Sequence, residues 1–202
     1  MLLLLLAGVA PGSRPPEPDA PCTDLWHYYA ALPLPARPER PALWWLDPDP
    51  CPFQTVLTGA PPPGGAAVWC ADRRDRAFGP RTQFQAGRIV LVSAFERDVE
   101  RGPRNEWDVA GRPIRHATLD RGALHGPQIE WTQDGGITAT SYARGEQHGP
   151  TWRISPQGAL SQVEHYVSGA REGRSCTWRD EQLQIDQLWE AGAPLSRVVR
   201  VD

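Results

Sequence analysis

The sequence predicts an all-β protein, an elongated antiparallel sheet built from about five tandem β-hairpin repeats of 23–24 residues. Three observations predict it. First, successive glycines lie 23, 24, 23 and 24 residues apart, at Gly79, Gly102, Gly126, Gly149 and Gly173. Second, alternating polar and apolar residues follow each glycine, as in a strand with one buried face. Third, 22 prolines and 19 glycines among 202 residues disfavour long helices. Periods of this size mark repeat arrays, in which each unit buries its apolar side on its neighbours.

Residues 1–21 form the first segment, a signal-peptide-like and proline-rich leader. The run from Met1 to Ala10 is apolar and ends in small residues, as a secretory signal does, although the positive charge that normally precedes such a run is missing. Either the true start lies upstream or the signal is weak. The run is too short to cross a bilayer as a helix. We therefore expect an exported protein of the periplasm, cell surface or medium, which does not span the membrane.

Residues 22–50 are rich in aromatic residues and proline. Residues 25–32 have the composition of a short helix, and Trp44 and Trp45 lie between proline-rich stretches. We hypothesise that these aromatic side chains pack on one face of the repeat sheet. The alternative is a flexible export linker.

The four cysteines are even in number, and none belongs to a Cys-x-x-Cys pair, so disulfides are favoured over zinc. Cys51 and Cys70 flank two short apolar runs, and a bridge between them would close an N-terminal cap hairpin over residues 51–78. Cys22 and Cys176 are left unassigned. A lipid anchor on Cys22 is disfavoured because Asp19-Ala20-Pro21 does not resemble a lipobox.

Each repeat within residues 79–192 is predicted to be two short strands and two turns. Large residues stand five positions after each glycine, on the same side of the strand as those at position three; they are Phe84, Trp107, Trp131, Ile154 and Trp178. The tryptophans are interpreted as core, with an exposed aromatic track as the alternative. In the second and third repeats the second strand is one residue shorter, so a bulge or a shifted register is expected there. Residues 193–202 are expected to form a C-terminal cap strand.

This pattern resembles the MORN-type repeats, and more closely their variant in the YwqK-type antitoxin-repeat family of bacteria. The units of that family read His-Gly-Pro, an aromatic residue, a turn glycine, Leu and then Tyr-x-x-Gly. The resemblance is carried by His125-Gly126-Pro127 with Trp131 and Tyr142, and by His148-Gly149-Pro150 with Tyr166. It covers residues 79–192, and it implies a sheet of stacked hairpins and an antitoxin-like role.

Polar residues at positions two and four after each glycine form the candidate binding face, represented by Arg104, Glu106, Gln128, Glu130 and Arg153. Glu106 and Glu130 are not expected to be catalytic, because a flat solvated sheet offers no pocket that would shift a pKa. His125 and His148 occupy matched positions two strands apart, roughly 9.5 Å, too far to share one zinc ion. No metal, cofactor or catalytic residue is therefore predicted.

The net charge of −3 gives no reason to expect nucleic acid as a partner. The sequence thus favours a non-enzymatic exported repeat protein, acting as a binding or scaffold module of a bacterial cell envelope. Its partner would be a protein or a polysaccharide. The alternative, implied by the family resemblance, is an antitoxin or immunity-type protein that masks a toxin by direct binding.

Overall fold

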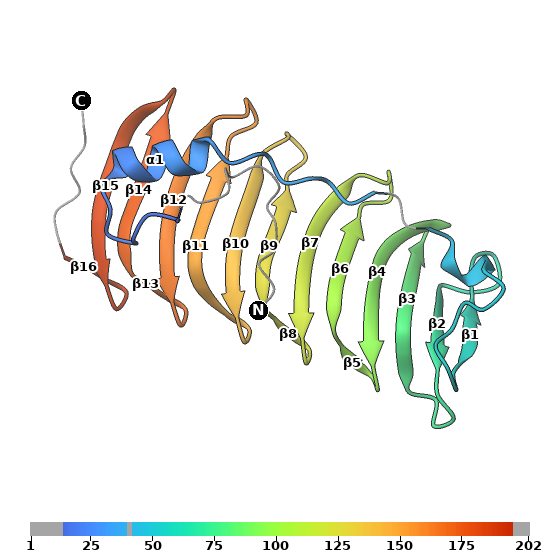
Figure 1. Ribbon diagram of the computed structural model, residues 1–202. Coiled ribbons are helices and arrows are strands. Elements are labelled where there is room, and N and C mark those ends of the chain that lie inside the picture. The colour runs from blue at the N-terminus through green and yellow to red at the C-terminus, as the bar shows by residue number, and fades with distance from the viewer. Residues whose placement is uncertain (1–13, 40–41, 196–202) are drawn as a thin grey trace. The chain divides into compact units, whose positions relative to one another are not determined.

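The computed structural model describes residues 14–39 and 42–195, which are drawn in colour in Figure 1. The chain divides into two compact bodies. The middle body comprises residues 37–130, and the C-terminal body combines residues 1–36 with residues 131–202. Within the described residues, both bodies consist of consecutive antiparallel hairpins. The predicted all-β hairpin-repeat class is confirmed. No helix of the described residues is long and apolar enough to cross a membrane.

The middle body begins with a short 3₁₀ helix, η1 (Trp44–Leu46), and continues as strands. Its main strands pair in the order of the sequence, and β5 and β8 are two-residue extensions that pair with β4 and β7. The strands are β1 (Val56–Ala60), β2 (Ala67–Ala71), β3 (Ala77–Gln85), β4 (Arg88–Glu96), β5 (Val99–Glu100), β6 (Gly102–Trp107), β7 (Pro113–Asp120), β8 (Ala123–Leu124) and β9 (Gly126–Trp131), which ends at the border between the bodies.

The C-terminal body begins with the single α-helix of the described residues, α1 (Cys22–Ala30). Its strands again pair with their neighbours in sequence, and the two-residue β13 and β16 pair with β12 and β15. They are β10 (Ile137–Ala143), β11 (Glu146–Ile154), β12 (Leu160–Val167), β13 (Ala170–Arg171), β14 (Gly173–Arg179), β15 (Gln182–Glu190) and β16 (Ala193–Pro194). The predicted cap strand over residues 193–202 is represented by β16, because residues 196–202 lie outside the described residues.

The five glycines that recur every 23 or 24 residues have a backbone conformation that residues with a side chain disfavour. All five have positive φ, between 77° and 100°, a region where only glycine is free of strain. The two-residue turns need it too, since both central residues have positive φ, as Arg121 and Gly122 do. The first repeat has Asp98 where the others have glycine, at φ 67°. The Asp98 carboxylate accepts a hydrogen bond from the Ala77 amide at 2.7 Å, which compensates for the unfavourable conformation.

The expected bulge is a general feature of these hairpins rather than a feature of the second and third repeats. In the first repeat Gln83 pairs with Leu91 and Phe84 with Ile89, so Val90 is an extra residue. The same irregularity separates Glu106 from Trp107, Arg153 from Ile154, and Thr177 from Trp178. The expected irregularity is thus present in the second repeat, and the second strand of the third repeat has one between Thr140 and Tyr142, but the irregularity is not limited to these two repeats.

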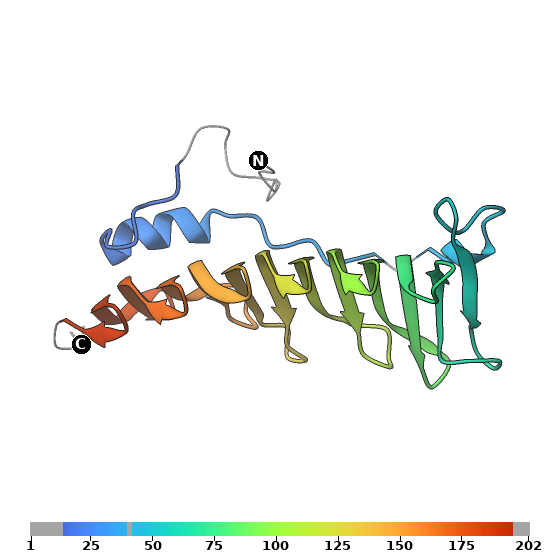
Figure 2. The ribbon, with the colours of Figure 1, turned by 90° about the horizontal axis from the view of Figure 1, so that it is seen from below.

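In the C-terminal body, α1 packs on one face of β12 and β14, as the two ribbon views show (Figures 1 and 2). Leu25 and Tyr29 of the helix are buried, and the Tyr29 ring meets the His165 ring edge-on at 6.3 Å between centroids. A disulfide joins Cys22 to Cys176, two residues that the sequence left unassigned. The segment around α1 is thus a packed part of this body and not a linker.

In the middle body, the corresponding layer is made by η1. The Trp44 indole donates a hydrogen bond to the hydroxyl of the fully buried Thr82 at 2.9 Å, and Trp45 packs edge-on against Phe84. The structure contains the predicted disulfide between Cys51 and Cys70. Each body therefore has one sheet face covered by an N-terminal segment and tied to it by a disulfide.

The core lies on these covered faces. Strand alternation places position three and position five of each repeat there. The large residues at position five are buried in the second to fifth repeats, and Phe84 of the first repeat is half-buried. Trp107, Trp131 and Trp178 are only 5–6% exposed, which confirms that they are core and not an exposed aromatic track.

Candidate ligand-binding groove

The opposite sheet face, here called the open face, carries the polar residues of the repeats. It differs between the two bodies. In the middle body its charged side chains form a closed network, whereas in the C-terminal body they surround a groove.

The network in the middle body has Glu106 at its centre. Glu106 accepts a hydrogen bond from Arg104 Nε at 2.8 Å and lies 3.5 Å from Arg115 Nη1. Arg115 also contacts Glu130 at 2.9 Å, and Arg104 contacts Glu100 at 3.1 Å. Three carboxylates thus neutralise two guanidinium groups. The carboxylates and guanidinium groups are hydrogen-bonded largely to one another, which leaves few of their polar atoms to bind a ligand.

The same face is aromatic near the start of the middle body. The Arg81 guanidinium lies over the rings of Trp69 and Phe95, 5.4 and 5.7 Å from their centroids. Cation–π contacts of this kind hold the side chain in place and cover both rings. This end of the open face is packed as well.

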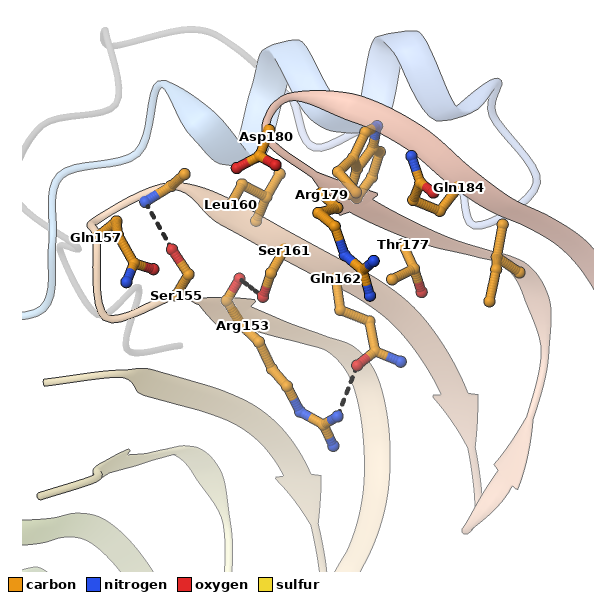
Figure 3. Close-up of a pocket in the computed structure, with 13 residues that line it drawn as sticks. Arg153, Ser155, Gln157, Leu160, Ser161, Gln162, Thr177, Arg179, Asp180 and Gln184 are labelled. Atoms are coloured by element: carbon orange, nitrogen blue, oxygen red, sulfur yellow. Dashed lines mark hydrogen bonds between the residues drawn. The ribbon is translucent and has the colours of Figure 1, made fainter. Parts of the chain in front are cut away.

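The C-terminal body has a hollow of about 860 Å³ on its open face, shown in Figure 3. It is built on β11, β12, β14 and β15, and most of the residues that line it are polar. They include Arg153, Ser161, Gln162, Thr177, Arg179, Asp180 and Gln184, and the apolar ones include Leu160, Trp178 and Ile185. A second hollow of about 340 Å³ shares Gln162, Thr177 and Ile185 with the first. It extends to Glu164, Arg171, Gln187 and Trp189. Because three residues line both hollows, the two hollows adjoin, and together they are here called the groove.

Register explains why these side chains meet. Arg153 pairs with Gln162, Gln162 with Thr177, and Thr177 with Ile185, so the four residues form one row across neighbouring strands. Directly paired residues on one face have their Cβ atoms about 5 Å apart. The row is therefore the floor of the groove, and it is set by the bulges that fix each register.

Two arginines at the groove lack an acidic partner within the described residues. Arg153 donates a hydrogen bond to the side-chain oxygen of Gln162 at 2.6 Å. Arg179 makes no ion pair with any residue that the structure describes, and Figure 3 shows its side chain beside Thr177 and Gln162. The exposed Asp180 is the one acid of the larger hollow. This part of the groove has a net positive charge.

The narrower end of the groove is charge-balanced. Arg171 lies 2.8 Å from the buried carboxylate of Glu164, and its guanidinium stands over the Trp189 ring at 4.8 Å. A hydrogen bond to the Tyr166 hydroxyl and the charge of Glu164 raise the pKa of Arg171, against the opposing effect of burial. The Trp189 indole nitrogen is buried and has no hydrogen-bond partner within the described part of the chain.

The structure brings only one of the five candidate residues to the groove. Arg153 lines it, while Arg104, Glu106 and Glu130 belong to the network of the middle body. Gln128 is half-buried on β9. His125 and His148 are both exposed, and the backbone N–H of Ser168 donates to His148 Nδ1 at 3.4 Å. Cys22, Cys176 and Asp186 lie close enough to suggest a metal site; however, the two sulfur atoms are used by the disulfide.

Sequence reasoning missed most of the groove, namely Gln162, Glu164, Arg171, Thr177, Arg179, Gln184, Ile185 and Trp189. A usable signal existed for some of them. Thr177 stands at the same repeat position as Arg153, and Arg179 follows it on the same strand face two residues later. The residues on the second strands carry no such periodic mark.

No protein-family model matches this chain, and no curated protein shows significant similarity to it.

Proposed function

We propose that the protein is an exported, non-enzymatic binding module, and that the groove on the open face of the C-terminal body is its binding site. The observation that carries the proposal is the contrast between the two faces of this body. One face is covered by α1 and tied by the Cys22–Cys176 disulfide, and the other holds a polar groove with arginines that lack acidic partners among the described residues.

Export is supported by the two disulfides, because such bonds persist in oxidising compartments. Binding without catalysis is supported by the lining of the groove. Its polar groups are mainly amides, hydroxyls and guanidinium groups, which recognise ligands by hydrogen bonds and are poor acids and bases near neutral pH. Membership in the MORN-like, YwqK-type repeats remains part of the proposal and rests on the repeat pattern.

The test is a pull-down from envelope extracts of the source bacterium with the disulfide-intact protein, followed by mass spectrometry of the protein and glycan fractions. The blocking variant is Ile185→Trp, because Ile185 lines both hollows and is 36% exposed. The matched control is Ile114→Trp, at a similarly exposed isoleucine of the middle body. We expect the blocking variant to lose a partner that the control retains.

Retention of every partner by Ile185→Trp would contradict the groove as the site. Capture of a single toxin, with loss of viability when this gene alone is deleted, would favour the antitoxin alternative.

A further inference from the structure

The chemistry of the groove identifies a class of ligand, an inference that rests on the proposed function. Three classes of ligand fit an open polar groove in general: an extended peptide, a neutral glycan and an acidic glycan. The contacts available in the groove distinguish among them.

A peptide is disfavoured by the position of the groove on a sheet face. Extended peptides are commonly bound by adding a strand to a sheet edge, where backbone N–H and C=O groups are unpaired. Here the floor lies on the face of β11, β12, β14 and β15, whose backbones pair with one another beneath it. In the described residues the outer edge of β15 pairs with β16 only at Trp189 and Glu190, so an added peptide strand would lie along that edge, beside the floor. A ligand on the floor itself meets side chains.

The side chains that remain suit a ligand rich in hydroxyl groups. Gln162 offers the N–H groups of its amide, because its side-chain oxygen accepts from Arg153, and Gln184 offers its amide oxygen. Thr177 adds a hydroxyl group, and Ser161, whose hydroxyl donates to the backbone oxygen of Arg153, adds an acceptor. Planar amides and guanidinium groups present two hydrogen-bonding atoms side by side, a geometry that matches neighbouring hydroxyls on a sugar ring. Ile185, which is 36% exposed, provides an apolar surface for the C–H face of such a ring.

The charge at the wider end selects an acidic ligand. Arg153 and Arg179 both line this hollow, and Asp180 is its one acid, so the net charge is about +1. At the narrower end Arg171 and Glu164 neutralise each other. Guanidinium groups bind carboxylates through two parallel hydrogen bonds. Neither Arg153 nor Arg179 makes an ion pair with an acid in residues 14–39 or 42–195.

From these contacts we infer that the groove binds an acidic oligosaccharide, with a uronate carboxylate held between Arg153 and Arg179 and a neighbouring sugar ring over Gln162, Thr177 and Ile185. The narrower end, around Trp189, takes the continuation of the chain.

The experiment is isothermal titration of the disulfide-intact protein with four probes at one salt concentration. Two are uronate oligomers, oligogalacturonate and oligoguluronate. The third is a neutral gluco-oligosaccharide of the same length. The fourth is an oligoglutamate peptide, which carries the carboxylates without the hydroxyls. We expect at least one uronate oligomer to bind, and the neutral oligomer and the peptide to bind at least about tenfold more weakly.

Variants locate the site. Arg153→Gln and Arg179→Gln should each weaken uronate binding by about tenfold, and Arg179→Lys should restore part of the loss because it keeps the charge without the planar fork. The matched control is Arg97→Gln, which removes an exposed arginine from a turn of the middle body and should leave the affinity unchanged.

Failure of both uronate oligomers to bind, equal binding of oligoglutamate, or equal loss in Arg97→Gln would overturn the assignment. The proposed function, that the groove is a binding site, is tested separately from the choice of an acidic oligosaccharide as its ligand. If Ile185→Trp loses a captured partner while no uronate binds, the groove is a binding site for another ligand.

Discussion

The open faces of the middle body and of the C-terminal body differ at one position of the repeat. This position is on the second strand of the hairpin, and its residue pairs with the residue at position four of the first strand. In the middle body this position holds Leu91 and Arg115, and in the C-terminal body it holds Gln162 and Ile185. Arg115 links two glutamates and closes the network. Gln162 and Ile185 carry no charge, so Arg153 and Arg179 keep their positive charge uncompensated. One scaffold thus yields either a packed surface or a groove, depending on this position.

The covered faces differ in a second way, in how their N-terminal segments are tied. The Cys22–Cys176 bond joins residues 154 apart in sequence, and the Cys51–Cys70 bond joins residues only 19 apart. In the chain-entropy model, the longer loop stabilises the fold by about 5 kcal/mol and the shorter by about 3 kcal/mol. We expect Cys22→Ala with Cys176→Ala to lower the free energy of unfolding more than Cys51→Ala with Cys70→Ala does. Urea denaturation of the two double variants measures the difference, and an equal or reversed order would show that strain or residual structure dominates.

Loss of the packing between α1 and the sheet should have the next largest effect on the free energy of unfolding. Leu25 is fully buried between the helix and the sheet, so Leu25→Ala removes apolar contacts and leaves a cavity. We expect a loss of about 3 kcal/mol in unfolding free energy, a typical cost for a buried leucine. The control is Leu34→Ala in the same segment, because Leu34 is 57% exposed and should cost little. Equal thermal stability of the two variants would mean that α1 does not contribute to the fold in solution.

Disrupting the charged network of the middle body should lower the free energy of unfolding by a smaller amount. It also contrasts directly with the groove, where two arginines lack acidic partners among the described residues. Glu106 contacts two arginines and its side chain is 17% exposed. Glu106→Gln removes the charge that compensates Arg104 and Arg115, and we expect a loss of about 1 kcal/mol. Glu190→Gln, at an exposed glutamate of the C-terminal body, is the control. Chemical denaturation at low and high salt distinguishes them, since screening should reduce the effect of Glu106→Gln. A salt-independent loss would indicate packing rather than charge.

The fold was predictable because its determinants are local. Glycines that recur every 23 or 24 residues set the length of the repeat, further glycines such as Gly87 and Gly111 mark its turns, and alternation assigns the faces. The open-face chemistry was less predictable. Whether Glu130 is a free ligand group or a partner of Arg115 depends on which residues pair across β7 and β9. The bulges that set such pairings leave no mark in composition.

The Cys22–Cys176 bond escaped prediction for a related reason. Its residues are 154 apart, and nothing in the sequence around either cysteine indicates the other. The aromatic residues of the N-terminal segment suggested packing on a face. Only the structure shows where α1 lies and which strand it is bonded to.

The smallest expected effect is a dependence of the stability of the fold on pH, which comes from histidines on the covered faces. Burial lowers the pKa of His165, which lies beneath α1 against Tyr29, and burial likewise lowers the pKa of His116 in the middle body. A lowered folded-state pKa means that the unfolded chain takes up the proton first. Stability is therefore complete above the unfolded pKa of about 6.5 and falls as the pH decreases toward the folded value. Thermal unfolding of His165→Gln between pH 7.5 and about 5 should show a flatter profile than the parent protein. The exposed His125→Gln should keep the parent profile, and an unchanged slope in His165→Gln would show that this histidine takes up its proton without loosening the contact with α1.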